Sequence, residues 1–190
     1  LSGICLWNYF SESLIKTSDT FLVNQGIFGK VYFPRLIAPL SVIITGLLKL
    51  FIQLGLFFAA YIWFVSKGMP NTINSDAWFF PLLILMLGLL GLGYGIIISS
   101  LTTKYRDLKF LIAFGVNLWM YATPVIYPLS VMEGRFQNYM WIMQANPVTS
   151  ILETFKAGFL GQGTFTIQTL TYSAIHTIVV LILGIFIFNR

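Results

Sequence analysis

The sequence has few of the side chains that carry enzyme chemistry or bind metals. It contains one cysteine, Cys5, and one histidine, His176, in 190 residues. A single thiol cannot form an internal disulfide, and one cysteine with one histidine leaves little room for a metal centre or a thiol nucleophile. We interpret His176 as a packed or hydrogen-bonded structural residue. We therefore predict no catalytic residues and no metal site on this chain.

The chain also lacks the glycine patterns that bind nucleotides. Residues 26–31 (GIFGKV) place a glycine before a lysine, but the spacing is wrong for a phosphate-binding loop and Val31 replaces Ser or Thr. Gly91, Gly93 and Gly95 lie in an apolar run and follow no strand, so they are not a dinucleotide fingerprint. Gly91 and Gly95 instead fit the small-xxx-small spacing of closely packed membrane helices.

Charge is scarce and long apolar runs are abundant. Charged residues make up 9% of the chain and hydrophobic residues 57%, whereas a soluble domain carries about 25% charge. A chain this short cannot bury so much apolar surface, so we predict lipid as its solvent. A membrane-crossing helix needs roughly 20 apolar residues. Apolar runs of this kind occupy residues 37–65, 78–101 and 169–188. Residues 108–121 are shorter, and residues 1–20 are ambiguous because they contain several polar side chains.

The basic residues predict the orientation of the chain. Three lie in residues 16–36, three in residues 102–109 and one at residue 190, which gives 3 + 3 + 1 = 7 on one side against three on the other. Short loops rich in Lys and Arg face the cytoplasm. This parity requires residues 1–20 to cross the membrane as well, so we predict five crossings. The basic residues form no stripe on a polar face, which argues against nucleic acid as a partner.

Residues 124–165 are too polar to span a membrane and too apolar for an ordinary loop. Asn146 followed by Pro147 is a favourable helix start, because a capping side chain precedes a proline in the first turn. Apolar residues then recur on one face, and Glu153 and Lys156 lie on another. We predict two short amphipathic helices that dip into the outer leaflet. A surface loop with one helix is the alternative.

Two ionisable residues, Glu12 and Lys49, fall at membrane depth. An unpaired lysine at the middle of a span costs at least ~2.5 kcal/mol. If the spans begin at Thr20 and Ile37 on the inner side, the heights of the two residues differ by roughly 6 Å at 1.5 Å per residue, so we predict an ion pair between neighbouring helices. A local pair of Glu12 with Lys16 is also possible, as is a Lys49 that snorkels or lines a wet cavity.

A stripe of aromatic and amide side chains runs along residues 108–121. Phe110, Phe114, Asn117 and Tyr121 recur at intervals of four, three and four, which places them on one helix face. Asn117 is costly against lipid, so this face should look inward. Aromatic rings stack on sugar rings, and amide and hydroxyl groups bind sugar hydroxyls. The stripe therefore suits a carbohydrate path, although ordinary helix packing would also account for it.

Four stretches resemble one protein family. They are residues 30–35 (KVYFPR), 104–110 (KYRDLKF), 118–128 (LWMYATPVIYP) and 146–158 (NPVTSILETFKAG). Each is similar to a motif of the type-2 ABC export permeases for O-antigen, capsular polysaccharide and teichoic acid. The order and spacing of the motifs also match, and the resemblance covers essentially the whole chain.

The resemblance implies a fold and a set of partners. The fold is an all-α polytopic membrane bundle of six spans with periplasmic re-entrant amphipathic helices. Residues 1–190 would form a single transmembrane domain that lacks the first span and an N-terminal helix. The permease would be a homodimer in the bacterial plasma (inner) membrane, in contact with membrane lipids and a lipid-linked glycan substrate. Two copies of a separate ABC ATPase subunit would bind ATP and Mg, and this chain itself would hold no cofactor.

The resemblance also implies roles for particular residues. The substrate path between the two copies would use Phe110, Phe114, Asn117, Trp119 and Tyr121. The periplasmic gate would use Pro124, Tyr127, Pro128, Trp141, Asn146 and Pro147. Coupling to the ATPase would use Gln25, Gly26, Ile27, Phe28, Gly29, Lys30, Tyr32 and Arg35. ATP binding would move the coupling region and shift the channel between closed and open states.

Three other functions compete with this one. A type-2 ABC exporter of a drug, lipid or other small molecule shares the fold, but we do not expect it to combine the YFPR and PVIYP stretches. An ion-coupled carrier would typically show inverted repeats and helices broken near the midplane, and the sequence shows neither. A membrane enzyme would need an active site, for which the sequence offers no candidate.

Overall fold

The computed structural model describes residues 2–24, 26, 36–68, 70, 73–126, 140–161, 163 and 166–188. Every regular element in these ranges is a helix, and the predicted all-α fold is confirmed. The α-helices are α1 (Ser2–Val23), α3 (Ile37–Ser66), α4 (Phe80–Lys104), α5 (Leu108–Ala122), α7 (Met140–Ala145), α8 (Pro147–Leu160) and α9 (Ile167–Phe188). The 3-10 helix η1 (Ser75–Phe79) leads into α4. Each apolar segment of the sequence is therefore a helix, with ends within a few residues of those expected.

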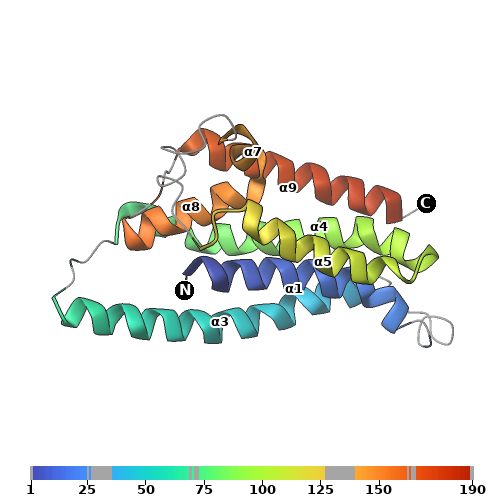
Figure 1. Cartoon of the computed structure of the whole chain (residues 1–190), viewed down its shortest axis with the longest axis horizontal. Helices are drawn as coiled ribbons and strands as arrows, with labels where there is room; N and C mark the ends of the chain where they lie inside the picture. The colour runs from blue at the N-terminus through green and yellow to red at the C-terminus, as the bar shows by residue number, and fades with distance from the viewer. Residues whose placement is uncertain are drawn as a thin grey trace.

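The long helices form a bundle in which α1, α4 and α9 run in one direction and α3 and α5 run in the other (Figure 1). α4 lies between α1 and α9, α3 packs on α1, and α5 contacts both α1 and α4. Gly3 at the start of α1 meets the backbone of Val125, just beyond α5. At the opposite end, Thr102 near the end of α4 donates a hydrogen bond to the carbonyl of Ser18 in α1. The helices thus alternate in direction, as the predicted loop parity requires.

Glycines allow α4 to approach the helices on both sides closely. A Cβ atom at Gly91 would lie 2.8 Å from the Cβ of Ser13, and one at Gly95 would lie 2.5 Å from the Cβ of Thr17. A Cβ atom at Gly93 would lie 3.0 Å from a side-chain atom of α9. Because these separations are shorter than van der Waals contact, the glycines are needed for the packing. The structure confirms close helix packing at Gly91 and Gly95.

In the part of the chain that the structure describes, three helices are long and apolar enough to cross a membrane, namely Ile37–Ser66, Ser75–Thr103 and Ile167–Phe188. α5 is a shorter apolar helix, and α1 has 22 residues with several polar side chains. This set of helices is that of a multi-pass membrane protein. The number of five crossings stays a prediction.

α8 is buried on all its faces. Every residue from Pro147 to Gly158 is buried, including Glu153 and Lys156 on the face that the sequence marks as polar. The helix packs against α9, η1 and α4, and Phe155 lies 6.0 Å from Phe57 of α3 between ring centroids. The predicted helix therefore exists, but the polar face expected of an amphipathic surface helix is covered by protein. Its place in the outer leaflet stays a prediction.

Candidate functional site

α5 presents one exposed face along its length. Phe110, Phe114 and Tyr121 are 69%, 62% and 69% exposed, and Asn117 is exposed as well. Val116, on the opposite face, is buried against the bundle. The four residues of the stripe therefore share a face that points away from their own bundle, so within the single chain this face does not look inward as expected. An amide on such a face is costly against lipid, so the face is suited to protein or water.

Trp119 lies on the other side of α5. Its ring centroid is 6.2 Å from that of Trp7, 5.4 Å from that of Phe10 and 5.7 Å from that of Tyr94, with each pair edge to face. Such pairs stabilise packing, and this cluster holds α5 against α1 and α4. Trp119 is therefore inside the bundle, apart from the stripe with which the sequence analysis grouped it. Its position two residues from both Asn117 and Tyr121 is the signal that could have separated it.

The turn after α5 is tied to the start of α8. Thr123 Oγ1 donates to the carbonyl of Trp119 at 2.9 Å and accepts from Asn146 Nδ2 at 2.8 Å. Asn146 Oδ1 accepts from the amide of Val148 at 3.1 Å. The predicted helix cap is thus present, and the same side chain also holds the end of α5. Pro124 of the predicted gate is buried in this turn.

A buried ion pair on α8 supplies a second contact with the turn after α5. Lys156 Nζ lies 3.0 Å from Glu153 Oε1 and donates to the carbonyl of Pro124 at 2.5 Å. Only 9% of the lysine side chain and 2% of the glutamate side chain are exposed. A buried ammonium group requires such partners because its desolvation is costly. This pair is not among the site residues predicted from the sequence, although the i,i+3 spacing of acid and base could have indicated it.

The two ends of α8 have further anchors. Ser173 Oγ of α9 donates to the carbonyl of Pro147 at 3.0 Å. At the other end, the backbone N–H of Asn74 donates to the carbonyl of Gly158 at 2.9 Å. The helix ends at Leu160 and is followed by Gly161, whose φ of 62° is in the left-handed region that favours glycine. α8 is therefore fixed between α9 and the segment that leads into η1.

Glu12, Lys16 and Lys49 form a charge cluster between α1 and α3. Glu12 Oε1 lies 2.5 Å from Lys16 Nζ, and Glu12 Oε2 lies 2.6 Å from Lys49 Nζ. The interhelical pair and its local alternative therefore occur together. The lysine side chains are 57% and 56% exposed and the glutamate side chain 23%. The charge cluster therefore joins α1 to α3 through a contact between side chains.

His176 joins α9 to α4. Its Nε2 lies 2.8 Å from the hydroxyl of Tyr94, and its ring lies beside that of Tyr172. This geometry fits the hydrogen-bonded structural role. Within the described ranges no group of three or more His, Cys, Asp or Glu side chains could hold a metal ion.

Several predicted site residues fall outside the described residues. These are Tyr127 and Pro128 of the gate, and Gln25, Ile27, Phe28, Gly29, Lys30, Tyr32 and Arg35 of the coupling region. From the same two groups, Gly26 is exposed and Trp141 on α7 is 68% exposed.

Comparisons with known proteins identify the family. Residues 1–160 match the family model described as ABC-2 type transporter. Two proteins of Klebsiella pneumoniae, each described as O-antigen export system permease protein RfbA, are 26% identical to this chain over 190 residues, which is 100% of this chain and 70% of each relative. A protein of Myxococcus xanthus with the same description is 25% identical over 157 residues, covering 83% of this chain and 58% of the relative. With its apolar helices and a family match over most of its length, this chain is a multi-pass membrane transport protein that belongs to the ABC-2 type transporter family.

Proposed function

We propose that this chain is the permease subunit of an ABC exporter that moves lipid-linked polysaccharide across the bacterial plasma membrane. O-antigen, capsular polysaccharide and teichoic acid are the candidate cargoes. The three relatives are described as O-antigen export permeases and align with 83–100% of this chain. The observation that carries the proposal is the exposed face of α5, where aromatic rings, an amide and a phenol occur together on the side turned away from the bundle.

A path for a polymer needs a second wall, which a second copy of the chain would supply with its own α5. Aromatic side chains then offer stacking surfaces to sugar rings, and Asn117 and Tyr121 offer hydrogen-bonding groups. Such contacts are weak one by one and repeat along the helix, which suits a chain that has to slide. A homodimer with its path between the two copies meets these requirements.

The energy for export would come from partner chains. An ABC ATPase subunit below each permease copy would bind ATP with Mg, and the region around Gly26 would receive its motion. This chain would perform no hydrolysis and hold no cofactor. Its contribution would be a path whose closed and open states have different populations when ATP is bound.

The test is a double substitution on the stripe, Phe114→Ala with Tyr121→Ala. We expect export of the surface polysaccharide to fall about tenfold, because two aromatic contacts worth about 0.5–1.5 kcal/mol each are lost. Surface polysaccharide is quantified in a strain that depends on this permease, and copurification of the ATPase subunit shows that the complex still assembles.

The matched control is Phe186→Ala, which removes an aromatic side chain that is 63% exposed on α9. It should leave export unchanged. Normal export by the double variant would remove the α5 face from the proposed path. Normal surface polysaccharide after deletion of the permease, together with loss of small-molecule efflux, would favour the small-molecule exporter.

A further inference from the structure

The ammonium group of Lys156 joins α8 to the turn after α5. An apolar side chain of similar size could fill the same buried space. Lys156 is buried among core residues of α8, and its ammonium group contacts the carbonyl of Pro124 and the carboxylate of Glu153. Replacing a buried ion pair with apolar side chains of similar volume is often neutral or even stabilising. A gain in folding stability therefore does not by itself explain why this pair is present. The geometry that the pair imposes on the neighbouring turn is a better guide to its role.

That geometry concerns the end of the proposed path. α5 stops at Ala122 because Pro124 cannot continue the helix, which leaves the last carbonyls without helical partners. Lys156 binds the carbonyl of Pro124, and Asn146 binds the side chain of Thr123. Two positions ten residues apart on the α8 segment thus hold two adjacent residues of the turn. Two such contacts fix the direction of the turn as well as its position.

The turn is held on a third side by α1. A Cβ atom at Gly3 would overlap the carbonyl of Val125, so the start of α1 lies directly against the backbone of the turn. Tyr121, whose exposed ring ends the stripe, precedes the turn by two residues. A displacement of α8 relative to α1 must therefore change the position of Tyr121.

We propose that Lys156, held in place by Glu153, is a positioning residue that makes α8 and the outer end of α5 move as one unit. This inference rests on the proposed function, because it assigns the unit to the outer end of the export path. Lys156 would not touch the substrate itself. It acts through the carbonyl of Pro124, and the path opens at its outer end only when α8 moves as well.

The test uses the paired substitution Glu153→Leu with Lys156→Met in the assembled permease–ATPase complex. The pair removes both charges, so no uncompensated ion is left in the core and the protein should fold. We expect a melting temperature and a rate of ATP hydrolysis close to those of the unmodified complex. The amount of polysaccharide exported per ATP hydrolysed should fall several-fold, because the outer end of α5 no longer follows α8. A purely structural role would lower melting temperature, assembly and export together.

The matched control is Thr154→Val. Thr154 is also polar and buried on α8, but its hydroxyl bonds within the helix, to the carbonyl of Ser150. This variant should keep the normal ratio of export to hydrolysis. A normal ratio in the paired variant would overturn the inference and leave the proposed function intact.

A second measurement does not depend on the substrate. Spin labels at positions 122 and 160, in a Cys5→Ser background, report the distance between the end of α5 and the end of α8. We expect a narrow distance distribution in the otherwise unmodified protein and one at least several-fold broader with the paired substitution. An unchanged distribution would overturn the inference even if no export could be measured. A broadened distribution with the paired substitution would support the link, and absence of polysaccharide export by the unmodified complex would reject the proposed function.

Discussion

At the scale of single residues, the charge cluster shows how a sequence with few ionisable groups accommodates them. The two carboxylate oxygens of Glu12 contact two different lysines, Lys16 and Lys49. One contact stays within α1 and the other reaches α3, so they should differ in their contribution to stability. An i,i+4 pair on one helix contributes about 0.2–0.5 kcal/mol, whereas a polar contact between membrane helices contributes about 0.6 kcal/mol on average and up to about 1.7 kcal/mol.

We expect Lys16→Gln to lower the free energy of unfolding by less than about 0.5 kcal/mol. Glu12→Gln should lower it by about 0.5–2 kcal/mol, because it removes the link to α3 and leaves two ammonium groups close together. Unfolding in mixed detergent micelles, followed by circular dichroism, gives both values. Equal losses for the two variants would show that the contact with Lys49 contributes nothing beyond the local pair.

At the scale of elements, the contact between α1 and α4 depends on residues without side chains. Gly91 faces Ser13 and the backbone of Phe10, whereas Gly55 on α3 has no atom within 4 Å of the place its Cβ would occupy. The same substitution at these two sites should therefore have opposite consequences.

Gly91→Ala should destabilise the protein by about 1–3 kcal/mol, because the new methyl group forces the two helices apart. Gly55→Ala should be neutral or slightly stabilising, since the change there only favours the helix. Melting temperatures of the two purified variants provide the comparison. A Gly91→Ala variant as stable as the Gly55→Ala variant would mean that α1 and α4 are not in close contact.

The helices could be predicted from the sequence to within a few residues, and their environments only in part. Apolar runs and the Asn146-Pro147 start are local signals, and both gave correct elements. The burial of Glu153 and Lys156 could not be read in the same way, because it depends on α9, η1 and the turn after α5, which are distant in the sequence. Trp119 could have been separated from the substrate-path residues, since helical periodicity places it on the face of α5 opposite the stripe.

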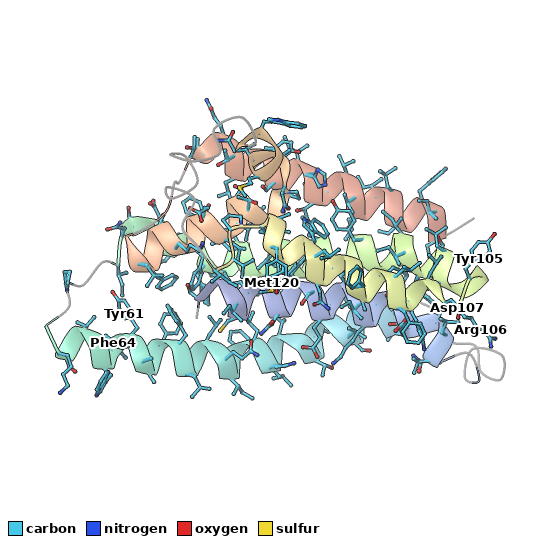
Figure 2. All side chains as sticks on the ribbon, viewed as in Figure 1. Tyr61, Phe64, Tyr105, Arg106, Asp107 and Met120 are labelled. Atoms are coloured by element: carbon cyan, nitrogen blue, oxygen red, sulfur yellow. The ribbon has the colours of Figure 1, made fainter. Side chains whose placement is uncertain are left out.

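At the scale of the whole molecule, the turn between α4 and α5 lies at the opposite end of the bundle from the C-terminal end of α3. Figure 2 shows Tyr105, Arg106 and Asp107 at one end, far from Tyr61 and Phe64 near the C-terminal end of α3. The two ends lie on opposite sides of the membrane if the predicted topology holds, with Arg106 in the cytoplasm.

Single cysteines test this arrangement directly, because Cys5 is the only native thiol and can be replaced by serine. In intact cells, an impermeant maleimide should label Lys67→Cys at the outer end of α3 and should not label Arg106→Cys. Both variants should react after the membrane is permeabilised, which confirms that each thiol is accessible. Labelling of both positions in intact cells would contradict the orientation.

The burial of α8 also has a consequence for the surrounding lipid. α8 and η1 are packed into one end of the bundle, beside the C-terminal half of α3, whereas the described residues at the other end belong mainly to the long helices. If α8 lies in the outer leaflet as predicted, the protein occupies a larger cross-section in that leaflet than in the other. Such a tapered body fits best where that leaflet is expanded, so local curvature of the bilayer should influence where the protein collects.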